Sequence, residues 1–73
     1  MGVEKIIEKM ERQPNGVRYN EISKVLNKYG YELVRSKGSH RHFRNNQGDV
    51  ITIKEETPLK AVYVKDVLKR IGR

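Results

Sequence analysis

The stretch G-Y-E-L-V-R-S-K-G-S-H-R-H-F-R, from Gly30 to Arg44, marks the point at which the sequence changes from a helical to an extended pattern. Before it, apolar residues follow the i, i+3, i+4, i+7 spacing of an amphipathic helix. Gly30 is the residue type that commonly ends such a helix in the left-handed conformation. After it, apolar and polar residues alternate, as they do in β-strands. The helical stripe consists of Ile22, Val25, Leu26 and Tyr29.

Two strands joined by a tight turn are predicted within this stretch. Residues 31–36 alternate in polarity, Lys37 and Gly38 supply a turn, and the segment from His40 to Arg44 alternates again. Successive side chains of a strand point to opposite faces of the sheet. The predicted faces are Tyr31, Leu33 and Arg35 against Glu32, Val34 and Ser36 in the first strand, and His40, His42 and Arg44 against Arg41 and Phe43 in the second.

Helices and one more strand are predicted on either side of this hairpin. They are a helix over Val3–Glu11, a second helix with its N-cap near Asn20, a strand over Val50–Lys54 and a last helix over Ala61–Ile71. Because short turns join the strands, the sheet should be antiparallel, and the last two helices must cover one of its faces. We therefore predict an α+β fold in a single domain, residues 1–73, with the other face of the three-stranded sheet open and polar.

The positive charge of the chain is concentrated in two blocks. The 73 residues include sixteen Lys and Arg and nine Asp and Glu, a net charge of +7. Residues 35–44 contain four cations and no acid, and residues 60–73 contain five cations and one acid. Localised cations attract polyanions and release counterions when nucleic acid binds. Nucleic acid is therefore the first partner to consider, and a merely solubilising surface is the alternative.

The sequence contains no cysteine and no long apolar segment. Without cysteine, disulfide bonds and thiolate chemistry are excluded. No apolar run approaches the roughly 20 residues that a membrane-spanning helix needs, and the first ten residues lack the apolar segment of a signal peptide. We expect a cytoplasmic protein without membrane association.

The residues from Lys37 to Arg41 supply the groups that RNA cleavage without a metal requires. Gly38 allows a tight turn and the close approach of a ligand, and Ser39 offers a hydroxyl. Histidine accepts and releases protons near neutral pH, so His40 can take the proton of a ribose 2′-hydroxyl. Lys37 and Arg41 can hold a phosphate and neutralise the charge that develops on it. The pattern predicts a ribonuclease site with His40 as the base.

Simpler interpretations of these residues stay open. A single histidine on a strand more often packs or faces solvent than catalyses, and for His42, on the same predicted face as His40, a structural role is favoured. No metal or cofactor is expected, because the two histidines have no third ligand nearby and the surrounding positive charge opposes a cation. Phe43 belongs either to the core or to a base-stacking site, and Lys65 and Lys69 form either a solvated helix face or a phosphate track.

The run from Gly30 to Arg44 resembles the core signature of HicA-type toxins, small messenger-RNA interferases of bacterial toxin–antitoxin modules. N-N-Q-G-D-V-I-T-I resembles the turn and third strand of that family, and Leu59 to Gly72 resembles the terminal helix of one branch, so the likeness covers residues 18–72. It implies a fold like that of the double-stranded-RNA-binding domain, α-β-β-β-α, here preceded by an additional helix in residues 1–13. It also implies RNA cleavage by a histidine at the position of His40, and a HicB-like antitoxin that covers this surface.

The resemblance carries over to individual residues, with one departure in the sequence. Gly38 and Ser39 correspond to the turn that presents the histidine, and Lys37 to a phosphate contact. Many members have P-x-H before a lysine after the third strand, whereas this chain has K-E-E-T-P-L-K. Either Glu55 or Glu56 takes the place of the second histidine, or the activity is reduced.

The predicted function is a toxin that cuts messenger RNA as a metal-independent endoribonuclease and is inhibited by a HicB-like antitoxin. One alternative is an RNA-binding module of the same fold that does not cleave. Another is a protein-interaction domain whose basic surface meets an acidic partner. His40 is the predicted catalytic residue and His42 a lesser candidate. The predicted RNA-binding residues are Lys37, Gly38, Ser39, Arg41, Arg44, Lys65 and Lys69.

Overall fold

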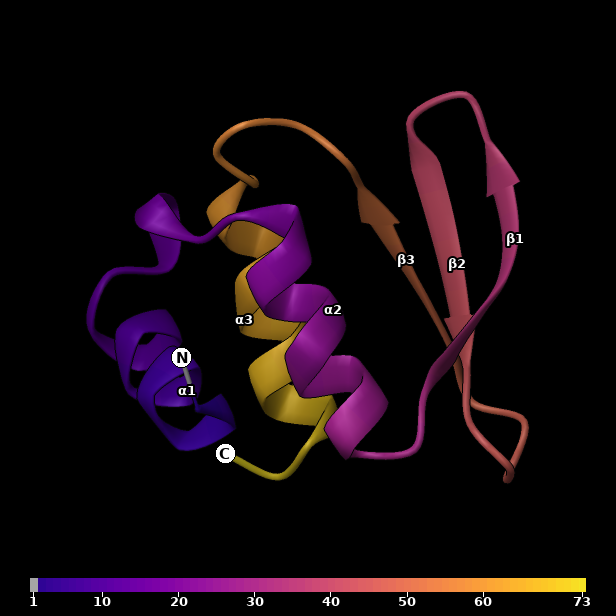
Figure 1. The fold of residues 1–73 in the computed structure, drawn as a ribbon, viewed down its shortest axis with the longest axis horizontal. Helices are drawn as coiled ribbons and strands as arrows, with labels where there is room; N and C mark the ends of the chain where they lie inside the picture. The colour runs from indigo at the N-terminus through magenta and orange to yellow at the C-terminus, as the bar shows by residue number, and fades with distance from the viewer. Residues whose placement is uncertain (1) are drawn as a thin grey trace.

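The helices and strands follow one another in the order that the sequence predicts. In the computed structural model, which describes residues 2–73, three α-helices lie on one side of a three-stranded antiparallel sheet (Figure 1). From the second helix onward the order α-β-β-β-α is that of the double-stranded-RNA-binding-domain fold, so the predicted α+β class is confirmed. The elements are α1 (Val3–Arg12), a 3-10 turn η1 (Pro14–Gly16), α2 (Tyr19–Lys28), β1 (Glu32–Lys37), β2 (His40–Arg44), β3 (Val50–Lys54) and α3 (Ala61–Arg70).

Helix α2 begins slightly earlier than predicted. Its N-cap is Arg18, and Asn20 lies inside the first turn. The amide N–H of Arg18 donates a hydrogen bond to Oε1 of Glu21 over 3.0 Å. A carboxylate in the first turn thus satisfies a backbone donor at the start of the helix, where it also interacts well with the helix dipole. The prediction of Asn20 as the N-cap is therefore wrong.

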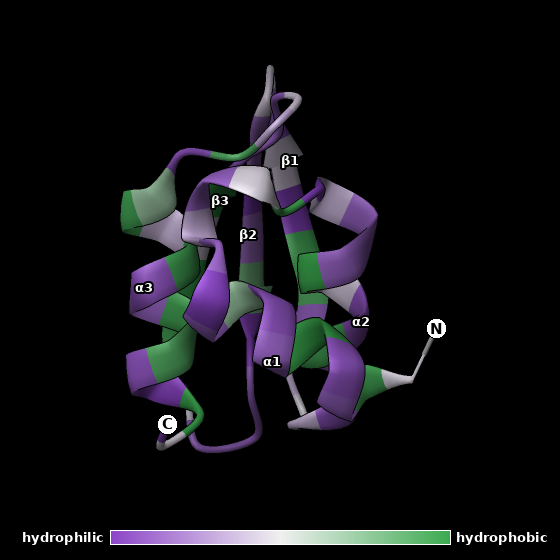
Figure 2. Cartoon of the chain, turned by 90° about the vertical axis from the view of Figure 1, so that its left-hand side faces the viewer, coloured by the Kyte–Doolittle hydropathy of each residue, from purple (hydrophilic) through white to green (hydrophobic). Residues whose placement is uncertain are grey.

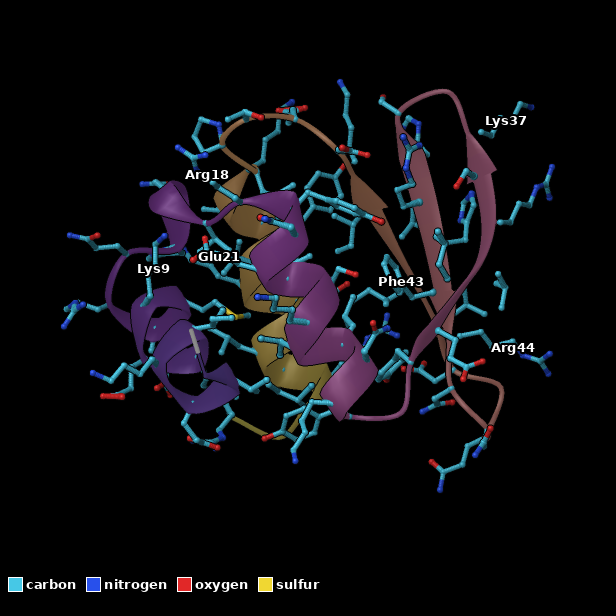
Figure 3. The ribbon with its side chains drawn as sticks, viewed as in Figure 1. Lys9, Arg18, Glu21, Lys37, Phe43 and Arg44 are labelled. Carbon is cyan, nitrogen blue, oxygen red and sulfur yellow. The ribbon has the colours of Figure 1, made fainter. Side chains whose placement is uncertain are left out.

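Helix α1 forms an outer layer that packs on α2 and α3, with the sheet on the far side of these two helices (Figure 2). It buries Ile6, Ile7 and Met10. Nζ of Lys9 lies 2.9 Å from Oε1 of Glu21 on α2, where the two side chains meet (Figure 3). The additional helix therefore enlarges the core of a small domain. That core consists of Ile6, Ile7, Met10, Val17, Ile22, Val25, Leu26, Tyr31, Phe43, Ile51, Ile53, Leu59, Val64 and Val67.

Strand β2 lies between β1 and β3 at the centre of the sheet. Its Phe43 is buried beneath the helices together with Ile51 and Ile53 of β3. The ring of Phe43 packs against that of Tyr19 on α2, with 6.3 Å between the ring centroids. Phe43 is therefore a core residue rather than a base-stacking one. Because side chains alternate along a strand, the residues of β2 on the other face are His40, His42 and Arg44, in agreement with the sequence pattern.

A β-bulge in β1 reverses the predicted orientation of the second half of that strand. Leu33 pairs with Phe43 but Arg35 pairs with His42, so β1 advances by two residues where β2 advances by one. Directly opposed residues of an antiparallel pair point to the same face. Arg35 therefore faces away from the helices with His42, and the prediction that it shares a face with Leu33 is wrong. The extra residue, Val34, continues the alternation in the sequence and gives no sign of the bulge.

Asp49, in the loop between β2 and β3, joins helix α3 to the end of the sheet. The hydroxyl of Tyr31 donates a hydrogen bond to Asp49, and Nη1 of Arg70 donates to Oδ1 of Asp49 over 2.8 Å. The hydrogen bond from Tyr31, followed by that from Arg70, lowers the pKa of Asp49. The same bond to Asp49 raises the pKa of Tyr31. The folded state therefore favours the ionised form of this carboxyl group.

Phe43→Ala is expected to lower the free energy of unfolding by about 3–5 kcal/mol, because it removes a fully buried ring. Leu33→Ala is a matched control, since Leu33 opposes Phe43 on the same face but is 48% exposed. It should cost about 1 kcal/mol or less. Urea unfolding followed by circular dichroism measures both values. Equal losses would contradict the burial of Phe43 in the core.

Asp49→Asn is expected to remove a pH-dependent stabilisation. A carboxyl group with a lowered pKa in the folded state stabilises the fold fully above its unfolded pKa, about 3.9 for Asp. That stabilisation is lost as the pH falls through the folded value. The parent should therefore exceed Asp49→Asn in stability at about pH 6, and the difference should shrink below about pH 4. Urea unfolding across this range measures the difference, and one that does not change with pH would contradict the assignment.

Candidate nucleic-acid interface

The side of the sheet that faces away from the helices presents residues from all three strands. The burial of Phe43 identifies the opposite face, and the register fixes which residues of β1 and β3 lie on each side. In Figure 3, Lys37 and Arg44 extend away from the helices and Phe43 extends toward them. The surface that we call the open face consists of Glu32, Arg35 and Lys37 of β1, His40, His42 and Arg44 of β2, and Val50, Thr52 and Lys54 of β3.

His40 lies in the middle of a row of three residues that crosses the open face. It pairs with Lys37 on β1 and with Lys54 on β3. The Cβ atoms of directly opposed residues in antiparallel strands are about 4.5–5.5 Å apart. His40 is exposed. Its imidazole is therefore accessible from solvent and has a lysine on each neighbouring strand.

His42 belongs to the next row and is held by a neighbouring strand. Its Nδ1 is hydrogen-bonded to Oγ1 of Thr52 on β3, 2.9 Å away. Arg35 opposes it on β1. His42 is half-buried, whereas His40 is exposed. The sheet therefore orients the ring of His42, while the ring of His40 is presented to solvent.

The turn before His40 consists of Gly38 and Ser39, since Lys37 and His40 form the last pair of the hairpin. Gly38 has a φ of 58°, in the left-handed region that glycine adopts without steric cost. Glycine at the first central position is typical of the type II′ turn. A Cβ added to Gly38 would meet no atom within 4 Å, so backbone conformation rather than space explains the glycine. The amide N–H of Glu55 donates to the carbonyl of Ser39 over 2.7 Å, which ties this turn to the end of β3.

Arg41 faces the helices, and its guanidinium stabilises this turn from the helix side of the sheet. Its Nη1 donates to the carbonyl oxygen of Gly38 over 2.6 Å, and its Nη2 lies 2.9 Å from Oε1 of Glu55. Burial raises the pKa of the neighbouring Tyr19, and the carboxylate of Glu55 adds to that rise. Because side chains alternate along a strand, Arg41 lies on the opposite side of β2 from His40. The structure does not bring it together with the other predicted phosphate contacts.

Three cations of the open face lack an acidic partner. Arg35, Lys37 and Arg44 form no ion pair with a carboxylate of residues 2–73. By contrast, Arg41 and Arg70 are each ion-paired. Cations that are left unpaired on one surface create a positive potential that attracts phosphate groups.

Two cations of the open face, Arg35 and Lys54, are absent from the residues predicted to form the site. Arg35 reaches this face through the bulge. Lys54 opposes His40 because the loop over residues 45–49 sets the register between β2 and β3. The alternation along β3 predicts the face on which Lys54 lies. The residue opposite Lys54 depends on the register between β2 and β3.

Lys65 and Lys69 lie outside the open face. Both are exposed on α3, which packs on the other side of the sheet (Figure 1). The structure therefore does not bring them together with His40. Contact between these lysines and RNA stays a prediction about a separate surface.

Neither a cluster of metal ligands nor a membrane-spanning helix is found in residues 2–73. No three His, Asp or Glu side chains of this range lie close enough together to hold a metal ion. None of its helices is long and apolar enough to cross a membrane. The two histidines of the open face thus lack a third protein ligand there.

A match to one protein family covers most of this architecture. Residues 19–72 match the family described as HicA toxin of bacterial toxin-antitoxin. The match runs from the start of α2 to just beyond α3 and leaves out α1. No curated protein and no solved structure gives a significant match. Since the family match covers well over half of the chain, including the whole open face, this chain belongs to the HicA toxin family of bacterial toxin–antitoxin systems.

Proposed function

We propose that this HicA-family toxin is a metal-independent endoribonuclease that cuts messenger RNA, with His40 as the catalytic base. The observation that carries the proposal is the position of His40, an exposed imidazole at the end of the central strand, on a face where three cations lack acidic partners. Membership of a toxin family supports an activity that harms the cell. The adjacent Lys37 supports phosphate as the group that is bound.

In the proposed reaction, His40 accepts the proton of a ribose 2′-hydroxyl, and the 2′-oxygen attacks the adjacent phosphorus. The bond between phosphorus and the 5′-oxygen of the next nucleotide breaks. That oxygen takes up a proton from the histidinium or from water, which leaves a 2′,3′-cyclic phosphate and a 5′-hydroxyl. Lys37 and Arg44 hold phosphate groups and offset the charge that develops in the transition state. The turn at Gly38 and Ser39 presents the imidazole at the end of the strand.

Arg41 contributes to this function indirectly. Because its guanidinium is bonded to the carbonyl of Gly38 and to Glu55, it fixes the turn that precedes His40. An arginine with two short contacts inside the protein is a poor partner for an incoming phosphate. Arg41 is thus proposed as a positioning residue, in place of the phosphate contact that its sequence position suggests.

RNA binding without cleavage is the second candidate function. It is favoured by Glu55 and Glu56, which stand where many members of the family have a second histidine. Both carboxylates are ion-paired, with Arg41 and with Lys54 respectively. A glutamate in an ion pair does not replace the imidazole of a second histidine, and a base without an acid partner supports slower cleavage.

A HicB-like antitoxin is proposed to inhibit the toxin by covering the open face. A toxin of a toxin–antitoxin system implies an antitoxin partner. An acidic partner surface would replace RNA phosphates on Arg35, Lys37 and Arg44, and it would block access to His40 at the same time. Inhibition then needs no change of shape in the toxin.

His40→Ala is expected to reduce the rate of RNA cleavage by about 100-fold or more, the usual contribution of a general base. The fold should be retained, because His40 is exposed. His42→Ala is the matched control, and its rate of RNA cleavage should fall by about tenfold or less. The measurement is cleavage of a labelled messenger RNA by each protein in the presence of EDTA.

Cleavage by His40→Ala at the parental rate would exclude His40 as the base. Cleavage by the parent that stops when EDTA is added would contradict metal independence. RNA that stays intact with the parent but is bound by it would favour the binding module instead.

Arg44→Glu is expected to weaken the binding of both RNA and antitoxin by roughly tenfold, because it places a negative charge within the cationic surface. Lys28→Glu makes the same change of charge on α2, on the helix side of the sheet, and should leave both affinities near the parental values. Surface plasmon resonance at low and high salt measures the effect, which should be larger at low salt. An antitoxin that binds Arg44→Glu as tightly as the parent would place its contact elsewhere.

A further inference from the structure

Lys54 shares the open face with His40 but differs from the other cations there in its ion pairing. Its Nζ lies 3.5 Å from Oε2 of Glu56, and the two side chains are 39% and 30% exposed. A partly exposed ion pair with a single long contact contributes little to stability. The carboxylate is therefore a partner that another anion can readily replace.

Arg41 and Glu55 show how a cation that holds the fold together is bound in this protein. The guanidinium makes two short contacts, 2.6 Å to the carbonyl oxygen of Gly38 and 2.9 Å to Glu55. Both contacts lie on the helix side of β2. Lys54 has one longer contact and lies on the side of His40. Of these two ion-paired cations, Lys54 is therefore the one that can exchange its partner for a ligand at the open face.

The backbone fixes Lys54 relative to His40. The two residues are directly opposed in the register. The strands also stay connected beyond this pair, since the amide N–H of Glu55 donates to the carbonyl of Ser39 over 2.7 Å. Neighbouring strands are about 4.8 Å apart, which puts the Cα atoms of Lys37 and Lys54 roughly 10 Å apart, with His40 between them. Flexible lysine side chains can reach a phosphate above the imidazole from both sides.

We propose that Lys54 binds the RNA phosphate at His40, and that Glu56 holds the ammonium group of Lys54 until this phosphate displaces it. The inference rests on the proposed function, because it assigns a substrate contact within the same site. Lys37 and Lys54 then share the phosphate charge from opposite sides of His40. Glu56 acts as an internal competitor that lowers the affinity for RNA.

The test first measures binding in the His40→Ala background, in which the RNA stays intact. A single-stranded RNA of about 20 nucleotides is titrated at several salt concentrations. Lys54→Ala should weaken binding about tenfold and reduce the slope of log affinity against log salt by about 0.7, the value for one phosphate contact on a single strand. Lys54→Arg should restore the slope. Lys5→Ala removes the same charge from an exposed position on α1 and should leave the slope unchanged.

Glu56→Gln should tighten RNA binding about threefold while Lys54 is present. In the Lys54→Ala background the same substitution should have a smaller effect, because only the general repulsion between carboxylate and phosphate is then relieved. An equal effect in both backgrounds would overturn the role of Glu56. A Lys54→Ala protein with the affinity and slope of Lys5→Ala would overturn the role of Lys54.

Cleavage assays on proteins that retain His40 separate this inference from the proposed function. If the parent cleaves RNA and Lys54→Ala matches Lys5→Ala in affinity, slope and rate, the inference fails while the nuclease stands. If the parent leaves RNA intact and Lys54→Ala still loses one phosphate contact, the nuclease proposal fails. The assignment of Lys54 as a phosphate-binding residue is then supported by binding alone.

Discussion

Every second side chain of β2 packs beneath the helices. This alternation decides on which side of the sheet the candidate interface lies. Phe43 is fully buried against Tyr19 and the rest of the core. The same strand must then present His40 and His42 to the opposite side. A slip of one residue would bury the histidines and expose the phenylalanine, which the loss of apolar burial forbids. The burial that folds the chain therefore also orients the imidazole of the proposed nuclease.

The pairing of charges divides the cations of this protein into two groups. One group joins elements of the fold: Lys9 links α1 to α2, Arg41 braces the β1–β2 turn, and Arg70 connects α3 with the β2–β3 loop. These pairs use carboxylates that would otherwise offset the positive charge elsewhere. Other cations form no ion pair with a carboxylate of residues 2–73, and three of them, Arg35, Lys37 and Arg44, lie on the open face. The unpaired cations of the open face contribute a positive potential on the side of the sheet where His40 lies.

The fold was largely predictable because its signals are local. Helical spacing, alternation and glycine positions gave the α+β class, and the bounds and faces of β2. The site was only partly predictable, because its composition depends on contacts between distant residues. Arg41 was predicted to be a phosphate contact because its actual partner, Glu55, is 14 positions further along the chain, and no local pattern links the two residues. Lys54 was overlooked because only the register sets it opposite His40. The bulge that turns Arg35 outward depends on strand pairing, which alternation in one strand cannot reveal.

That bulge also bears on how such a surface can evolve. All six residues of β1 are exposed, so a codon inserted or deleted there disturbs little of the core. Because the turn at Gly38 and Ser39 fixes Lys37 opposite His40, such a change leaves the pairs between it and the turn in place. Loss of Val34 would remove the bulge and still leave Leu33 opposite Phe43 and Arg35 opposite His42. The length of this edge strand can thus vary at the bulge while the charges beside His40 stay where they are.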